Sequence, residues 1–234
     1  MKLARLRGKP EIFYSIQGEG TYGGRPSVLV RTSHCNLHCT WCDTAYTWNW
    51  RKFQEQEQAI DLTPWEIAQE VMTHSCFNVV FTGGEPLLQM KGLFEVASIL
   101  RGYMQYIFDV ETNGTILPDQ AFDSVIHLYT VSQKLETSGN GARERVNEHA
   151  LRFFALNHKA VFKFVITAKK DFAEIHSFLM HYPVAAHRVW LMPEGTSVAE
   201  LDAKAPWIID ECKLNGWNYS DRLHIRAFGD VRGT

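Results

Sequence analysis

Hydrophobic and polar positions alternate along the chain in a pattern that predicts strands and helices in turn. Short runs rich in β-branched and aromatic residues are typical of strands, and stretches with amphipathic helical periodicity separate them. Strands are expected at residues 27–32, 78–84, 106–112, 127–134, 160–167, 188–195 and 222–229. Because strands that alternate with helices pair in parallel, the pattern predicts an α/β fold with a mostly parallel sheet.

The number of expected strands indicates the architecture. Six or seven strands are too few for an eight-unit barrel, so we expect an open, partial (β/α) barrel of about six parallel strands with an additional terminal strand. Such a barrel would gather the carboxyl ends of its strands around one cavity. No internal repeat, low-complexity tract or linker divides residues 1–234, which are expected to form a single domain.

Two helix starts carry capping signals. Thr63 is followed by a proline and by Glu66, and Ser197 is followed by Glu200, so each offers an N-cap and a capping-box acid. The polar stretch 49–63 before the first of these helices is expected to be a solvated loop.

Composition narrows the function classes. The chain carries 24 Lys and Arg against 26 Asp and Glu, a formal charge of -2, with no basic cluster. It therefore lacks the surface that nucleic-acid binding needs, and we expect a small-molecule substrate. No apolar run has the length of a membrane span, and no hydrophobic segment follows the basic opening, so we expect a cytoplasmic protein without membrane attachment. The isolated Cys76 and Cys212 are expected to be core residues.

The other three cysteines, Cys35, Cys39 and Cys42, lie within eight residues. Because His34 and His38 are close by, spacing alone leaves a Cys3His zinc site open. A [4Fe-4S] cluster held by three cysteines would instead leave one iron free for an exogenous ligand. Such an iron can chelate the amino and carboxylate groups of S-adenosylmethionine and reduce its sulfonium, which yields a 5′-deoxyadenosyl radical.

The cysteine spacing, with Trp41 just before the third cysteine, resembles that of radical S-adenosylmethionine enzymes. The segment FTGGEP, residues 81–86, ends a predicted strand with two glycines and resembles the family segment that binds the methionine amino group, although alone it would predict only a turn. The resemblance implies that residues 1–234 form a radical S-adenosylmethionine domain. It implies cofactor binding by Trp41, Gly83, Gly84, Glu85, Glu111, Asn113, Ser132, Lys134 and Met192, of which the strand-end polar residues are individually also typical turn formers.

A set of further segments is spread over nearly the whole chain: residues 11–20 (EIFYSIQGEG), 30–48, 81–86, 111–114, 131–134 and 223–234. Together they resemble the 7-carboxy-7-deazaguanine synthase family. The resemblance implies conversion of 6-carboxy-5,6,7,8-tetrahydropterin to 7-carboxy-7-deazaguanine and ammonia, on the way to queuosine and other deazapurines. It also implies that S-adenosylmethionine is regenerated, that no protein side chain carries the radical, that flavodoxin or ferredoxin supplies the electron, and that the protein is a homodimer.

Recognition of that substrate requires a cation that faces its carboxylate, and hydrogen-bond donors and acceptors that face the edge of the pterin ring. Arg31 can supply the cation, while Glu19 and Gln17 can meet the pterin amine and ring N–H groups. Thr82 and His224 are assigned to the substrate as well. A glycine-rich turn with an exposed acid remains the alternative for Gln17 to Gly20, and a half-buried surface position remains the alternative for His224.

Asp43 and Thr44 follow the third cysteine directly. Local turn chemistry would explain them. The resemblance implies instead that Thr44 contacts a Mg²⁺ ion bound to the substrate carboxylate, with Asp43 acting behind it on a metal-bound water or on the loop. One departure from the family pattern is Gln133, which stands where several members have proline. The alternative functions are a glycyl-radical activating enzyme, whose substrate is a polypeptide, and a non-catalytic metal-binding module.

Overall fold

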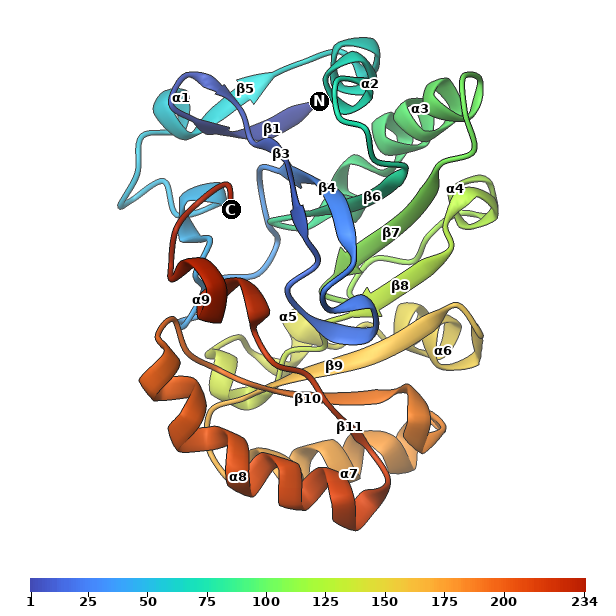
Figure 1. The fold of residues 1–234 in the computed structure, drawn as a ribbon. Coiled ribbons are helices and arrows are strands. Elements are labelled where there is room, and N and C mark those ends of the chain that lie inside the picture. Colours follow the sequence, from blue (N-terminus) through green and yellow to red (C-terminus); the bar gives the residue numbers. More distant parts are fainter.

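The computed structural model describes residues 1–234, which are built around one curved sheet (Figure 1). Its strand order is β11-β10-β9-β8-β7-β6-β4-β1-β2, with β3 paired to β4 and β5 paired to β1. The strands are β1 (Lys2–Leu6), β2 (Lys9–Pro10), β3 (Ile12–Ile16), β4 (Pro26–Thr32), β5 (Ala59–Asp61), β6 (Asn78–Gly83), β7 (Ile107–Thr112), β8 (Leu128–Val131), β9 (Ala160–Ile166), β10 (Val189–Pro193) and β11 (Asn218–Tyr219). The path from β4 to β11 is parallel, and the remaining pairs are antiparallel. The fold is therefore a mixed α/β fold with a largely parallel, open sheet, as the alternating pattern predicts.

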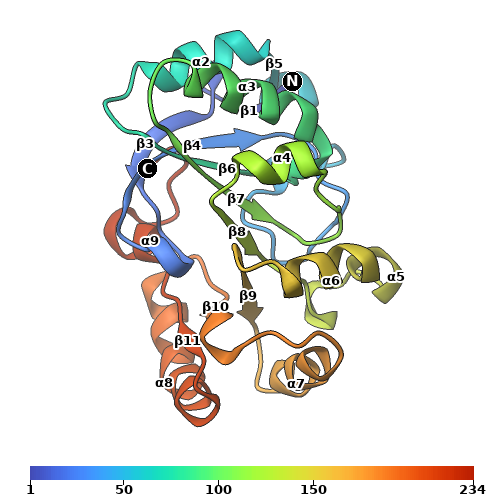
Figure 2. The ribbon, with the colours of Figure 1, turned by 90° about the vertical axis from the view of Figure 1, so that its right-hand side faces the viewer.

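Helices cover the outer side of this sheet, and α9 lies at its inner side together with the C-terminus (Figures 1 and 2). The α-helices are α1 (Glu55–Gln58), α2 (Pro64–Met72), α3 (Met90–Arg101), α4 (Gln120–Val125), α5 (Ala142–Arg145), α6 (Glu148–Leu156), α7 (Asp171–His181), α8 (Val198–Asn215) and α9 (Leu223–Phe228). Five short 3-10 helices connect them, at Gly20–Tyr22, Ala45–Thr47, Pro86–Gln89, Glu136–Ser138 and Ala186–Arg188. No helix is both long enough and apolar enough to cross a membrane.

The expected strand at residues 222–229 is wrong, because this segment forms helix α9. Its alternation of apolar and polar residues over six positions also fits a short helix, and periodicity over so few residues cannot separate the two. Only Ile225 of the helix is buried. The additional terminal strand exists, but it is the two-residue β11, which precedes this segment and pairs with β10.

The expected loop at residues 49–63 is wrong in part. It contains the four-residue helix α1 and the strand β5, which pairs with β1 at the antiparallel end of the sheet. Both capped helix starts are confirmed. Glu66 N donates to Thr63 Oγ1 at 3.2 Å while Thr63 N donates back to the Glu66 carboxylate at 2.7 Å, and Ser197 makes the same reciprocal pair at the start of α8.

Side chains along each strand point alternately into the hydrophobic core and toward the inner face of the sheet. In β9 all seven residues are buried, but for different reasons. Phe162, Phe164 and Ile166 join the hydrophobic core, which includes residues of the covering helices such as Ile175 and Ile208. Successive side chains of a strand point to opposite faces, so Lys163 and Val165 face inward, where both line a cavity.

Candidate active site

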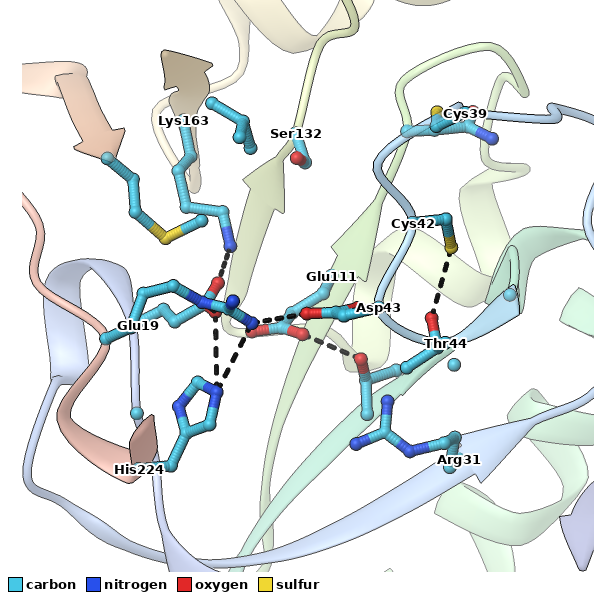
Figure 3. A pocket seen from close by; sticks show the side chains of 18 of the residues that line it. Glu19, Arg31, Cys39, Cys42, Asp43, Thr44, Glu111, Ser132, Lys163 and His224 are labelled. Atoms are coloured by element: carbon cyan, nitrogen blue, oxygen red, sulfur yellow. Dashed lines mark hydrogen bonds and ion pairs between the residues drawn. The ribbon is translucent and has the colours of Figure 1, made fainter. Parts of the chain in front are cut away.

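A cavity on the inner side of the sheet, at the carboxyl ends of its strands, collects nearly all of the predicted site residues (Figure 3). It is lined by Gln17, Glu19, Arg31, Cys35, Cys39, Trp41, Cys42, Asp43, Thr44, Thr82, Gly83, Gly84, Glu111, Asn113, Ser132, Lys134, Met192 and His224. Glu85 is the one predicted residue that does not line it. The register explains the gathering, since Arg31 is paired with Thr82 across β4 and β6, and Thr82 Oγ1 reaches Glu111 on the next strand, β7.

Each thiol of the cysteine loop receives an N–H group. The donors are Leu37 N to Cys35 Sγ (3.4 Å), Asn140 Nδ2 to Cys39 Sγ (3.2 Å) and Trp48 Nε1 to Cys42 Sγ (3.4 Å). A thiol is a weak acceptor, whereas a thiolate accepts strongly, so the three sites are arranged for deprotonated sulfur. Hydrogen bonds of this kind to cysteine sulfurs are one means by which proteins set the potential of iron–sulfur clusters.

Burial raises the pKa of Cys35 to about 12 and raises that of Cys39 as well. Without a bound cation these thiols therefore stay neutral at pH 7, and coordination to a metal centre would deprotonate them.

The geometry also bears on the zinc alternative. No three His, Cys, Asp or Glu side chains converge closely enough to hold a single metal ion. His34 directs Nε2 toward Glu55 at 3.2 Å, and the ring of His38 packs on Trp48 with centroids 4.8 Å apart. Neither histidine makes a hydrogen bond to a thiol. Three thiolates that bind separate irons of a cluster stand farther apart than ligands of one ion, which fits a cluster better than a Cys3His site.

Gly83 and Gly84 lie where the end of β6 meets the backbone leading into the cysteine loop. A Cβ at Gly83 would lie 2.2 Å from Thr32 O, and a Cβ at Gly84 would lie 2.0 Å from His34 O. Gly83 also has φ of +126°, which strongly favours glycine. The two glycines therefore let the cysteine loop pack directly onto the strand end.

Glu85 lies behind the wall of the cavity. Its carboxylate accepts from Thr112 Oγ1 at 2.8 Å, Asn113 N at 2.7 Å and Leu87 N at 3.0 Å, and its side chain is fully buried. These bonds tie the end of β6 to the end of β7. In this arrangement Glu85 positions Asn113, whose Nδ2 lies 4.0 Å from Cys35 Sγ.

The loop after β8 presents Ser132 and Lys134 to the cavity. Lys134 Nζ donates to Ser132 Oγ at 2.7 Å and lies 5.4 Å from the centre of the Trp41 ring. Gln133 points the other way and is buried, and its Nε2 donates to the carbonyls of Lys134 (3.1 Å) and Arg145 (2.9 Å). Hydrogen bonds from the side-chain amide of Gln133 therefore hold this loop in place. A proline at the same position would instead restrict the backbone directly.

Two networks organise the half of the cavity assigned to the substrate. In the first, Glu111 accepts from Gln17 Nε2 at 3.1 Å and from Thr82 Oγ1 at 2.7 Å, so a predicted cofactor residue orients two predicted substrate residues. In the second, Arg31 Nε donates to Glu11 Oε1 at 2.9 Å. The two terminal nitrogens of Arg31 make no hydrogen bond within the protein, which leaves them available to a ligand in the cavity.

Sequence reasoning missed the cations that surround Glu19. Lys163 Nζ and Arg222 Nε donate to opposite oxygens of the Glu19 carboxylate, and Arg222 also pairs with Asp43 (Figure 3). Burial opposes ionisation of Glu19, but the charges of Lys163 and Arg222 outweigh it and hold its pKa well below its usual range. Lys163 carried a signal, since it is the one charged residue in the apolar run AVFKFVIT.

The residues assigned to Mg²⁺ lie at the same edge of the cavity. Thr44 Oγ1 is 3.5 Å from Cys42 Sγ, so the hydroxyl stands between the cysteine loop and the cavity. Asp43 Oδ2 accepts a hydrogen bond from Arg222, and Asp43 Oδ1 has no partner in the protein. His224, at the start of α9, lies 3.4 Å from an Arg222 nitrogen through Nε2.

Comparison with known proteins gives one family. The Radical SAM superfamily model matches residues 29–151. Proteins named 7-carboxy-7-deazaguanine synthase are similar over nearly their whole length. That of Pyrobaculum aerophilum is 37% identical (95% of this chain and 95% of the relative), that of Rhodopirellula baltica 36% (96% and 87%) and that of Halobacterium salinarum 36% (96% and 91%). The crystal structure of QueE from Escherichia coli shares the fold, with a TM-score of 0.68 at 21% identity over 95% of both chains.

Proposed function

Because the chain belongs to the 7-carboxy-7-deazaguanine synthase family within the radical S-adenosylmethionine superfamily, we propose that it converts 6-carboxy-5,6,7,8-tetrahydropterin to 7-carboxy-7-deazaguanine and ammonia. The observation that carries the proposal is the convergence, in one cavity, of three cysteines with Gln17, Glu19, Arg31 and His224. The product would enter queuosine and other 7-deazapurine pathways. The open sheet would then work as a partial (β/α) barrel within one radical S-adenosylmethionine domain of residues 1–234.

The cysteine loop fits a [4Fe-4S] cluster, since each sulfur has an N–H donor directed at it and no histidine joins the thiols in a group that could hold a single metal ion. When bound, the cluster supplies the electron that cleaves S-adenosylmethionine and so provides the radical for hydrogen abstraction from the substrate. The chain's part is to hold three thiolates, exclude water and leave one corner of the cluster facing the cavity.

S-adenosylmethionine would be held by residues of the cysteine loop and of the carboxyl ends of the parallel strands. The residues that would hold it are Trp41, Gly83, Gly84, Glu111, Asn113, Ser132, Lys134 and Met192, with Glu85 acting through its bond to the Asn113 backbone. Lys134 and Ser132 offer a charged donor and a hydroxyl, and buried Met192 offers an apolar contact. The glycine pair supports this site by letting the cysteine loop pack against the end of β6.

The substrate would be held by a second set of residues that line the same cavity. Arg31 presents two free N–H groups suited to a carboxylate, and Glu11 fixes their direction from behind. Glu19 and Gln17 face the pterin edge, with Thr82 and His224 beside them. Thr44 would contribute its hydroxyl to a Mg²⁺ ion that otherwise binds water and substrate oxygens, and Asp43 would act from behind that ion.

Three further expectations remain proposals of the same kind. Reduction by a redox protein such as flavodoxin or ferredoxin and a homodimeric assembly follow from the family resemblance. A cytoplasmic location is proposed from the sequence, which has no apolar run of the length of a membrane span. The absence of a basic cluster in the sequence supports a small-molecule substrate over a nucleic acid.

The direct test is anaerobic turnover. Reconstituted enzyme, S-adenosylmethionine, Mg²⁺ and reductant are incubated with 6-carboxytetrahydropterin deuterated at C6, and the product and the recovered S-adenosylmethionine are analysed by mass spectrometry. Formation of 7-carboxy-7-deazaguanine with deuterium in the recovered S-adenosylmethionine supports the proposal. One 5′-deoxyadenosine per product, or no product at all, contradicts it and favours an activating enzyme that acts on a polypeptide.

A further inference from the structure

Four charged side chains form a closed group in the cavity: Glu19, Lys163, Arg222 and Asp43, here called the charge tetrad. They come from distant parts of the chain, namely the loop after β3, strand β9, the residue before α9 and the cysteine loop. Figure 3 shows the Lys163 ammonium above the Glu19 carboxylate. Arg222 joins Glu19 to Asp43, because its Nε donates to Glu19 Oε1 and its Nη2 donates to Asp43 Oδ2. Neither cation belongs to a motif found in the sequence.

The two cations of the tetrad are buried, which makes their pairing obligatory. Lys163 is 4% exposed and Arg222 is 6% exposed, whereas Glu19 is only partly buried and Asp43 is exposed. Leaving a cation unpaired at a buried position is strongly destabilising, so each cation needs its carboxylate. Arg222 distributes its donors over Glu19, Asp43 and the carbonyl of Gly195. Lys163 has no hydrogen-bond partner other than Glu19.

Two cations on opposite oxygens determine what Glu19 can bind. An ionised carboxylate only accepts hydrogen bonds, and each of its oxygens has two lone-pair directions. Lys163 takes one direction on Oε2 and Arg222 takes one on Oε1. One direction on each oxygen is left for a ligand in the cavity that Glu19 lines. Two parallel N–H donors match that remaining pair.

We propose that Lys163 and Arg222 are specificity-determining positioning residues, which fix Glu19 as an acceptor-only group and so select a 2-amino-4-oxo ring over its 2-oxo counterpart. The inference rests on the proposed function. The amine and the adjacent ring N–H of a pterin supply two parallel donors. A lumazine carries a carbonyl oxygen in place of the amine, and that oxygen meets a carboxylate that has no proton to offer. A site built on a polar partner rejects a ligand that leaves it unpaired.

Lys163 gives the cleaner test, because it has no other hydrogen-bond partner. The enzyme is reconstituted with cluster and S-adenosylmethionine but no reductant, and calorimetry measures binding of 6-carboxytetrahydropterin and of 6-carboxytetrahydrolumazine. The wild type is expected to prefer the pterin roughly 100-fold, and Lys163→Met is expected to weaken pterin binding about 10-fold and to reduce the preference below about 10-fold. In turnover, KM rises while kcat stays within about threefold.

Three variants separate this role from a general packing role. Lys163→Arg keeps the charge and is expected to restore most of the preference. The double variant Lys163→Met with Glu19→Gln keeps the tetrad's net charge but gives the site an N–H donor, so the preference should fall to near parity. Lys159→Met removes a lysine just before the same strand, paired with Asp123 and outside the cavity lining, and should leave the preference unchanged.

The outcomes distinguish the two proposals. A wild type that neither binds nor converts the carboxytetrahydropterin contradicts the proposed function. A wild type that does both, combined with an unchanged preference in Lys163→Met or in the double variant, contradicts the role of the tetrad. If Lys163→Met does not fold, the double variant still decides, because it contains no unpaired carboxylate at position 19.

Discussion

The imidazole of His224 packs directly on the α-carbon of Gly18, where an added Cβ would lie 1.9 Å from His224 Nδ1. The same two segments are joined by Leu223 N, which donates to Gly18 O at 2.9 Å. The glycine-rich loop after β3 and the start of α9 thus form one wall of the cavity, although they lie near opposite ends of the chain. Burial lowers the pKa of His224, so the ring is neutral at pH 7 and offers one donor and one acceptor.

A methyl group at position 18 should therefore displace His224. We expect Gly18→Ala to weaken substrate binding about 10-fold or more, roughly 1.4 kcal/mol, while iron content and S-adenosylmethionine binding stay unchanged. Calorimetric titration of reconstituted protein with the carboxytetrahydropterin measures this. Gly23→Ala is the matched control, since a Cβ at Gly23 meets only ordinary contacts at 3.4 Å and 3.6 Å. Equal effects of the two substitutions would show that loop flexibility, and not the contact with His224, matters.

Substitution of each of the three cavity cysteines should have an effect that substitution of the two core cysteines does not have. We expect Cys35→Ala, Cys39→Ala and Cys42→Ala each to abolish reductive cleavage of S-adenosylmethionine and to lower the iron content, because each removes one of three cluster ligands. Cys76→Ala and Cys212→Ala serve as controls, since their thiols are buried and donate to carbonyl oxygens of Pro26 and Asn218. Iron and sulfide analysis with an assay for 5′-deoxyadenosine tests this. Cleavage of S-adenosylmethionine by any of the three cavity-cysteine variants, or zinc as the metal of the wild type, would contradict the assignment of a [4Fe-4S] cluster.

The parallel strands were predictable from the sequence because their outward residues form unbroken apolar patterns such as those of β9. The antiparallel strands β1, β2, β3 and β5 were not predicted. β1, β2 and β5 are short and mix charged with apolar residues, and β3 follows β2 with no helix between them, so the alternation of strands and helices does not reveal it. Helix α9 was mistaken for a strand because β11 already occupies the edge of the sheet, and the chain that follows turns inward over the cavity. Such tertiary constraints are absent from local periodicity.

The site was predictable where residues stand in a motif and was missed where they act through space. The cysteine loop is recognised from its spacing, and the strand-end polar residues were assigned from the family resemblance and from their places at the ends of predicted strands. Lys163 and Arg222 acquire their roles only when the fold brings them to Glu19, and Asn140 and Trp48 only when it brings them to the thiols. Lys163, Arg222 and Asn140 lie too far along the chain from their partners for spacing to indicate the contacts. Only Trp48 lies close to its partner in the sequence.

Arg31 should bind the substrate carboxylate with the two nitrogens that Glu11 leaves free. We expect Arg31→Ala to weaken substrate binding by roughly 2 to 4 kcal/mol and to leave S-adenosylmethionine binding nearly unchanged, because a buried ligand carboxylate would lose its cation. Arg31→Lys should recover only part of this, since an ammonium cannot present two parallel N–H groups.

A structural role for Arg31 is the alternative, because it forms an ion pair with Glu11. Glu11 also accepts from Arg232 at 2.7 Å and from Tyr46 at 3.1 Å, so it keeps partners when Arg31 is removed. Arg232→Ala is therefore the matched control, because it removes the other arginine from the same carboxylate. Equal loss of substrate affinity in both variants, or unchanged affinity in Arg31→Ala, would assign Arg31 to the structure alone.

Thr44 should act through its hydroxyl on Mg²⁺ and not through the turn in which it lies. Its Oγ1 is within 3.5 Å of Cys42 Sγ and faces the cavity, and neither Thr44 nor Asp43 caps a helix by a side-chain hydrogen bond. A hard cation with mostly water ligands can be held by one hydroxyl and the substrate carboxylate, and it would orient the ring during the rearrangement.

We expect turnover of metal-stripped enzyme to rise with added Mg²⁺. Thr44→Ala should reduce turnover at least about 10-fold with the cluster spectrum intact, whereas Thr44→Ser, which keeps the hydroxyl, should retain most of it. If metal-stripped enzyme is indifferent to Mg²⁺, or if the Ala and Ser variants behave alike, Thr44 is a turn residue and the ion has no place in the site.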